Sequence, residues 1–272
     1  MSAAARMSPL REPLAAKVPE IGVLFWVIKL LTTGTGEATS DYLVAGNLVV
    51  AAAIGFFGFA IALWIQFRVR RYIAAAYWFA VMMVAVFGTM AADVLHKSFG
   101  VPYIGSTIFY AVVLAVVFYL WNKQERTLSI HSIVTTRREV YYWLTVLATF
   151  ALGTAAGDLT ARTMHLGYFS SAVLFAGLMV VPAVAWWRFK LNAVVAFWWA
   201  YVLTRPLGAS LADWFGKSRK LSGLGFGDGR VAVIATAAIV VLVGYLAVAR
   251  NDIQRGQPGS GARRPDRRNA TP

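Results

Sequence analysis

The chain has 272 residues, 59% of them hydrophobic and only 14% charged, whereas soluble domains are about 45–50% apolar and about 25% charged. This composition excludes an ordinary soluble domain, and the absence of cysteine excludes disulfides, thiolate metal sites and cysteine nucleophiles. The formal net charge of +14 would suggest nucleic-acid binding in a soluble protein, but here it has to be tested first against membrane topology.

Eight apolar stretches are long enough to cross a bilayer, which takes about 20 mostly apolar residues in a helix. They lack the apolar–polar alternation of a transmembrane β-strand. We therefore predict an all-α polytopic membrane protein with eight transmembrane helices, at about 21–43, 46–67, 72–95, 101–121, 140–161, 168–187, 193–214 and 229–249. Residues 1–20 contain Pro13 and Pro19 and lack the apolar core and cleavage site of a signal peptide. They are expected to remain as a cytoplasmic N-terminal segment.

The distribution of Lys and Arg predicts the orientation. With eight spans both termini lie on one side, which holds 18 of these residues against 6 on the other. The positive-inside rule then places both termini in the cytoplasm. The last outer loop, 215–228, fits least well because it carries Lys217, Arg219 and Lys220. Residues 250–272 are expected to be a disordered basic cytoplasmic tail that rests against anionic lipid rather than nucleic acid.

A four-fold repeat organises residues 21–249. Each unit starts with an aromatic residue and a Trp, followed by a Gly ten residues after the Trp and an Asp fifteen residues after it. The pairs are FW at 25–26, YW at 77–78, YW at 142–143 and FW at 197–198, with Gly36, Gly88, Gly153 and Gly208 and with Asp41, Asp93, Asp158 and Asp213. Four of the ten tryptophans have this frame, so chance is excluded.

Each repeat is predicted to be one helical hairpin, at about 21–67, 72–121, 140–187 and 193–249. Because each unit crosses twice, the four are parallel repeats related by an axis along the membrane normal. We expect the first helix of each hairpin to face that axis and the second to face lipid. The recurring glycines are interpreted as packing positions, since small residues let helices approach closely.

The recurring Asp residues, with one glutamate, are the candidate cation-binding or transport residues: Glu37, Asp41, Asp93, Asp158 and Asp213. Each Asp is about 30–33 Å along its helix, near the outer boundary of the hydrocarbon. The eleventh position after each Trp, one turn earlier, reads Glu37, Thr89, Thr154 and Ala209. The plain alternative is that these are interfacial acids, solvated or bonded to the outer-loop backbone. Against it, an acid at a helix C-terminus opposes the macrodipole, and here four copies do so.

Charge counting favours a cation at these acids. The five acids against Lys29 and Arg205 leave an excess of three negative charges, which has to be protonated, paired with a bound cation or open to water. Oxygen ligands favour a hard cation such as Mn²⁺, Mg²⁺, Ca²⁺ or H⁺. His96 and His165 follow Asp93 and Asp158 and are weaker candidate ligands, either of which is more simply an incidental loop residue. No metal is assigned and no organic cofactor is expected.

Lys29 and Arg205 are charged residues inside predicted spans, where a cation marks a functional site by default. The structural alternative is a salt bridge, from Lys29 to Glu37 or from Arg205 to an Asp of another repeat. Pro206 follows Arg205 and should kink its helix.

Three segments of the chain resemble a known family. They are KVPEIGVLFWVIKLLTTGTGEATSDYL (17–43), ERTLSIHSI-x-TTRRE (125–139) and YYWLTVLATFALGTAAGDL (141–159). In these the chain resembles an uncharacterised family of bacterial integral membrane proteins, described only as predicted membrane-anchored proteins. The resemblance covers about 17–249; it implies a bacterial inner membrane and carries no activity across.

Three functions compete. The first is a small cation transporter or channel, for a divalent metal or coupled to protons, lined by the acids above. The second is a non-transporting sensor, assembly factor or partner protein. An enzyme comes last, and we expect none, because no GxSG, HExxH or paired-Asp frame occurs and Ser129, His131 and Ser132 form no triad by spacing. The lipid bilayer is the expected partner, and a homo-oligomer stays open.

Overall fold

The computed structural model describes residues 16–254, and its regular secondary structure within that range is all helical. Its eight long helices are α1 (Val23–Gly46), α2 (Leu48–Arg68), α3 (Ala74–Asp93), α4 (Tyr103–Glu125), α5 (Thr136–Asp158), α6 (Gly167–Phe189), α7 (Ala193–Gly216) and α8 (Asp228–Ala249). Each coincides with one predicted stretch, so the all-α prediction is confirmed. Residues 1–15 and most of the predicted basic tail, 255–272, lie outside the described residues.

Local sequence explains where several helices start and how two of them end. Asn47 and Asn192 are the N-cap residues of α2 and α7. Their side-chain oxygens accept hydrogen bonds from backbone N–H groups two and three residues further along the chain. Thr135 does the same for α5.

After Asp93 and Asp158, at equivalent places in the second and third repeats, the helix widens into a π-helical turn, Val94–Ser98 and Leu159–Thr163. Such turns are rare and frequent at functional sites.

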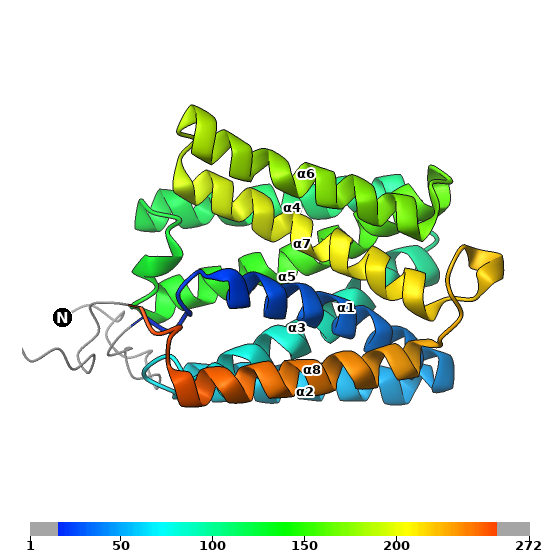
Figure 1. The fold of residues 1–272 in the computed structure, drawn as a ribbon, viewed down its shortest axis with the longest axis horizontal. Coiled ribbons are helices and arrows are strands. Elements are labelled where there is room, and N and C mark those ends of the chain that lie inside the picture. The colour runs from blue at the N-terminus through cyan, green and yellow to red at the C-terminus, as the bar shows by residue number, and fades with distance from the viewer. Residues whose placement is uncertain (1–15, 255–272) are drawn as a thin grey trace, which may run out of the picture.

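The first helices of the four repeats form the centre of the molecule (Figure 1). α1 packs against α3, α3 against α5, α5 against α7 and α7 against α1, which closes a ring. These four helices bury between 10 and 14 residues each, whereas α2, α4, α6 and α8 bury three to five. This is the arrangement that the repeat predicts.

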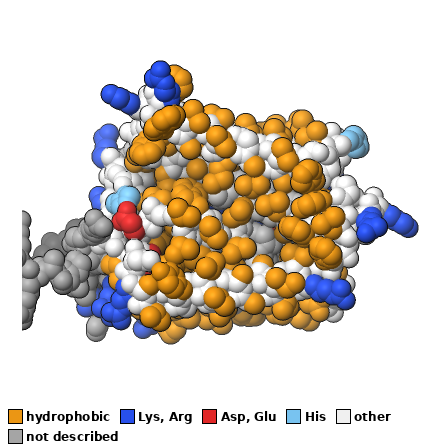
Figure 2. Space-filling view, in the orientation of Figure 1, with side chains coloured by type: hydrophobic (Ala, Val, Ile, Leu, Met, Phe, Trp, Pro, Cys, Tyr) orange, Lys and Arg blue, Asp and Glu red, His pale blue; other side chains and the backbone are white. Residues whose placement is uncertain are grey.

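The second helix of each repeat lies outside the ring and packs on the first helix of the next repeat. α2 packs on α3, α4 on α5 and α6 on α7, and α8 returns to α1. Figure 2 shows hydrophobic side chains over the middle of the visible face and Lys and Arg gathered toward its two ends. That distribution matches a hydrocarbon layer bounded by two polar surfaces.

Six of the eight helices, all except α1 and α7, are long and apolar enough to cross a membrane. These six make the chain a multi-pass integral membrane protein. α1 and α7 have 24 residues each, but they carry the charged residues of the bundle centre, which lowers their hydropathy. The prediction of eight apolar spans therefore holds in length for all eight helices and in composition for six.

The two ends of the described chain meet at one end of the bundle, which we call the terminal end. The Glu20 backbone N–H donates to the Asp252 carbonyl at 2.7 Å, and the Gln254 side chain donates to the Val18 carbonyl at 3.1 Å. Nearby, the buried Lys17 ammonium donates to the Glu139 carboxylate at 2.6 Å. The opposite end carries Asp41 and its three equivalents, and we call it the acidic end.

The four repeated glycines lie where neighbouring ring helices cross. A Cβ added to one would meet the residue seven positions after the Trp of the next repeat: Ala85 beside Gly36, Phe150 beside Gly88, Arg205 beside Gly153 and Thr33 beside Gly208. At Gly36 the atoms met include the Ala85 backbone, at 2.9 Å. The glycines therefore set the distance between the four central helices, as small residues do in membranes.

Candidate functional site

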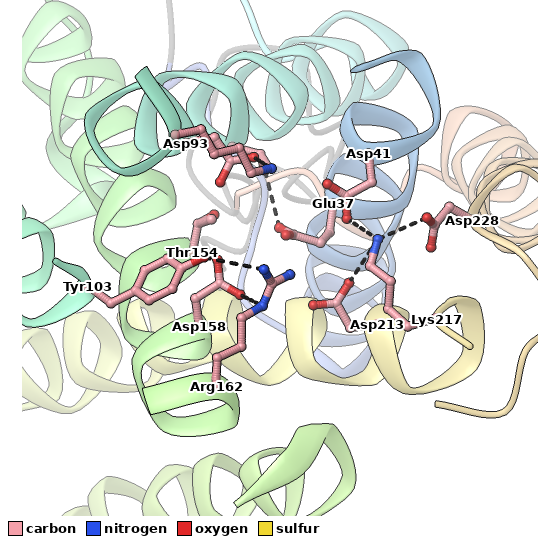
Figure 3. A network of polar contacts seen from close by, with 12 residues as sticks. Glu37, Asp41, Asp93, Tyr103, Thr154, Asp158, Arg162, Asp213, Lys217 and Asp228 are labelled. Carbon is pink, nitrogen blue, oxygen red and sulfur yellow. Dashed lines mark hydrogen bonds and ion pairs between the residues drawn. The ribbon is translucent and has the colours of Figure 1, made fainter. Parts of the chain in front are cut away.

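Polar side chains from all four ring helices converge toward the acidic end of the bundle axis (Figure 3). The four ring helices contribute one Asp each, and these acids lie at equivalent places in the repeats. Asp93, Asp158 and Asp213 are buried, as is Glu37, and Asp41 is half-buried. The sequence frame thus brings its acids to one end of one ring.

Arg205 is the central connection between the repeats. Its fully buried guanidinium donates to the Glu37 carboxylate at 2.7 Å, to the Thr154 hydroxyl at 2.7 Å and to the Thr33 carbonyl at 3.0 Å, and also to the Thr89 hydroxyl. Glu37, Thr89 and Thr154 occupy the same repeat position, the eleventh after the Trp. One arginine of the fourth repeat therefore donates hydrogen bonds to the residue at that position in each of the other three repeats.

Lys29 lies deeper along the axis and, within residues 16–254, pairs with no carboxylate. Among the described residues its Nζ atom has no hydrogen-bond partner, although the side chain is fully buried. It lies 4.3 Å from the ring centre of Phe150 and 4.4 Å from that of Tyr201, close enough for cation–π attraction. A Lys29–Glu37 salt bridge is therefore wrong, because Arg205 takes Glu37. Arg205 itself pairs with the Glu of another repeat rather than with an Asp.

Two of the four Asp residues are neutralised within their own helices. Lys97 donates to Asp93 at 2.7 Å and Arg162 approaches Asp158 at 2.9 Å, in both cases from four residues further along. The π-helical turns after α3 and α5 carry these two cations. Arg162 also donates to the Tyr103 hydroxyl at 3.3 Å.

Lys217, just beyond the end of α7, holds the remaining acids. Its ammonium lies 2.5 Å from Asp41, 2.9 Å from Asp228 and 3.8 Å from Asp213. Burial by itself lowers the pKa of Lys217, but the carboxylates of Asp41 and Asp213 outweigh it and raise the pKa above its usual value. On the alkaline side, the stability from these pairs is therefore present at neutral pH and is lost as pH rises through that raised pKa.

These pairs correct the charge count made from the sequence. The five candidate acids pair with four cations, Arg205, Lys97, Arg162 and Lys217, and Lys29, which lies over the Phe150 ring, brings the number of cations to five. Adding Asp228 leaves an excess of one negative charge rather than three. The count from the sequence left out Lys97, Arg162 and Lys217 because they lie in predicted loops. Each of them follows an Asp of the repeat by four residues. That spacing, D-x3-K or D-x3-R in repeats two to four, was visible in the sequence.

A candidate metal-ligand group is formed by Glu37, Asp41 and Asp213, whose carboxylate oxygens lie within 4.8 Å of one another. The group joins α1 to α7 and lies beside Lys217 and Arg205. Three carboxylates suit hard cations such as Ca²⁺, Mg²⁺ or Mn²⁺. Asp93 and Asp158 line the same end but lie outside this group.

The two candidate histidines are not part of the carboxylate group. The His96 Nδ1 atom lies 2.8 Å from the Val101 carbonyl, and its ring stacks on Tyr103 with 3.7 Å between centres. His165 has a positive φ of 55° in the turn before α6. These observations favour structural roles in the connecting turns.

The comparisons with known proteins identify the repeat. The family model described as Repeat of Unknown Function (DUF347) matches four segments of the chain, 24–72, 76–127, 141–192 and 196–252. Each matched segment contains one helical hairpin of the structure. No curated protein and no solved structure matches the chain. Since the four matches together span well over half of its length, the chain belongs to the Repeat of Unknown Function (DUF347) family.

Proposed function

We propose that this protein is a membrane transporter or channel for a small hard cation, a divalent metal or a proton, whose entry site is the Glu37–Asp41–Asp213 group. The observation that carries the proposal is the convergence of these carboxylates from two helices, within 4.8 Å of one another. Charged residues inside a membrane protein are costly and line ion pathways as a rule. No enzymatic activity and no organic cofactor are part of the proposal.

Lys217 acts in this proposal as a tethered competitor for the transported cation. Its ammonium already contacts Asp41 and Asp228 and lies near Asp213. A divalent ion that binds these carboxylates has to displace it, because the ion and the ammonium carry like charge and compete for the same oxygen atoms. Lys217 lies after α7 and is partly accessible, so it can move without breaking the ring.

Arg205 and Lys29 close the route below the entry site. Both are fully buried, and both lie over the Phe150 ring, at 5.1 Å and 4.3 Å from its centre. Two positive charges, one after the other along the bundle axis, form an electrostatic barrier to a cation. Passage therefore requires Arg205 to leave Glu37, and Pro206, next to it inside α7, removes a helix hydrogen bond and provides a place to bend.

The topology of the proposal is eight membrane-spanning helices in the bacterial inner membrane, with the terminal end in the cytoplasm. α1 and α7 are then shielded from lipid by the other helices, which explains how they carry charges at membrane depth. The Glu20 backbone N–H donates to the Asp252 carbonyl at 2.7 Å, so the two ends of the described chain lie on the same side of the bundle. This arrangement requires an even number of crossings. The lipid bilayer, with anionic lipid at the Arg-rich tail, is the proposed partner, and no nucleic acid is.

One observation favours a second candidate, a sensor or assembly protein that transports nothing. Each of the five candidate acids already pairs with a cation of the chain, and acids that are all paired also suit a static scaffold. The two candidates differ in whether a metal cation binds the carboxylates that Lys217 contacts.

The test is equilibrium binding of Mn²⁺ to the purified protein. Lys217→Met removes the tethered ammonium and leaves its carboxylates uncompensated, so we expect Mn²⁺ to bind about tenfold more tightly, a change of about 1.4 kcal/mol. Asp213→Asn removes a ligand and should weaken binding at least about tenfold, by the same arithmetic. Lys217→Arg keeps the charge and should resemble the unchanged protein.

Glu125→Gln is the matched control, because Glu125 pairs with Arg137 and Arg138 away from the site. It should leave Mn²⁺ binding unchanged. Absence of saturable binding in both the unchanged protein and Lys217→Met would contradict the proposal and favour the static scaffold.

A further inference from the structure

An apolar groove of about 570 Å³ lies between α1, α7 and α8. Its walls include Leu30, Gly34, Leu211, Ala235 and Ala238. The small side chains of Ala235 and Ala238 leave space in the groove, and Gly34 lets α1 approach Gly208 of α7 closely. α8 packs mainly on α1 here, so the groove follows the seam where α8 and α7 meet less closely.

One charged residue, Arg230, lines this otherwise apolar groove. It is exposed and lies in the first turn of α8, at the acidic end of the bundle. Over residues 16–254 it makes no ion pair, in contrast to Lys97, Arg162 and Lys217 at the same end. The groove therefore has an apolar body and a cationic mouth.

The connection from α7 to α8 adds two more free cations at this end. Phe226 N–H donates to the Phe215 carbonyl at 3.0 Å, and the two rings, which both line the groove, stack 6.3 Å apart. The loop beyond this pair carries Arg219 and Lys220, both exposed and without an ion pair inside the described range.

The exposed cations Arg219, Lys220 and Arg230 attract anions to this end of the bundle. The positive-inside rule disfavours this concentration of positive charge on the outer side, and the cation site proposed above uses only Lys217 of this loop. An apolar groove that opens to the membrane beside exposed cations fits one class of molecule, a lipid with an acyl chain and a negative phosphate.

We propose that this groove binds an anionic phospholipid of the outer leaflet. One acyl chain lies against α1, α7 and α8, and the phosphate is held by Arg230, the charged residue of the groove lining. The lipid seals the α7–α8 seam beside the helix that carries Arg205. This site lies at the opposite end of the bundle from Gln254, the last described residue.

The experiment measures lipid binding by native mass spectrometry on the full chain after delipidation, with phosphatidylglycerol and phosphatidylcholine as the two probes. The unchanged protein should bind phosphatidylglycerol more tightly. Arg230→Gln should lower phosphatidylglycerol binding at least fivefold and leave phosphatidylcholine binding unchanged. Ala235→Phe, which fills the groove, should weaken both lipids.

Arg188→Gln is the matched control, because Arg188 is an exposed arginine in the last turn of α6, outside the groove. It should leave the preference for phosphatidylglycerol intact. Equal binding of the two lipids by the unchanged protein overturns the proposal. A preference that survives Arg230→Gln also overturns it and assigns the anionic lipid to another surface, such as the tail. Neither result bears on Mn²⁺ binding at Asp213.

Discussion

At the scale of single residues, the two buried cations of the axis differ in how they are compensated. Arg205 is bonded to a carboxylate, two hydroxyls and a carbonyl. Lys29 has two aromatic rings and no hydrogen-bond acceptor in the described part of the chain. Removing a buried charge that has no partner stabilises the folded protein. Removing one member of a buried ion pair destabilises it, because the other charge stays buried without compensation.

Lys29→Met should therefore stabilise the protein. Methionine keeps the apolar contacts with Phe150 and Tyr201 and removes an uncompensated charge, so the free energy of unfolding is expected to rise by about 1–3 kcal/mol. The matched variant is Lys17→Met, which breaks the buried pair with Glu139 and should cost about 3–5 kcal/mol. Thermal unfolding in detergent measures both. Equal losses from the two variants would mean that Lys29 has a carboxylate partner after all.

At the scale of helices, the repeated Gly controls how closely neighbouring ring helices approach. The Cβ of an alanine at Gly36 would lie 2.9 Å from the Ala85 carbonyl carbon and 3.1 Å from its Cα. Both are backbone atoms, so the clash can be relieved only by moving α1 away from α3. That movement also shifts Glu37, the next residue, relative to Arg205.

Gly36→Ala is expected to lower the free energy of unfolding by about 1–3 kcal/mol, the usual cost of overpacking. Gly177→Ala is its control, since Gly177 lies within α6 and a Cβ there meets nothing within 4 Å. It should be neutral or stabilising by about 0.5–1 kcal/mol through helix propensity. The comparison is read from melting temperatures. A harmless Gly36→Ala would show that α1 and α3 do not pack as described.

The helices and their repeat were predictable because apolar length and a fixed frame are local properties of a sequence. The frame also predicted that the four Asp residues share one end of the ring. The partners of the charges were not predictable in the same way. Glu37 and Asp41 are both neutralised from α7, and that pairing depends on the first and fourth repeats meeting when the ring closes.

At the scale of the whole molecule, the position of α7 decides between two topologies. If all eight helices cross, Ser98 and Ser218 lie on one side and His131 lies on the other. If only the six apolar helices cross, Ser218 lies on the same side as His131. The ring contacts of α7 with α1 and α5 favour the first arrangement.

Single cysteines make this measurable, because the chain has none of its own. Ser98→Cys, His131→Cys and Ser218→Cys each place the thiol at an exposed position. In intact cells a membrane-impermeant maleimide should label Ser98→Cys and Ser218→Cys and spare His131→Cys. Labelling that groups Ser218→Cys with His131→Cys would refute the eight-span topology.

The most direct test of the account is cation flux into proteoliposomes containing the purified protein. We predict saturable Mn²⁺ uptake by the unchanged chain and by Glu125→Gln, whose pairs with Arg137 and Arg138 lie outside the carboxylate group. Uptake should fall at least about tenfold in Asp41→Asn and in Asp213→Asn, which each remove one of the three carboxylates. Equal flux in all four proteins, or no flux above that of empty liposomes with Mn²⁺ or with protons, would contradict the account.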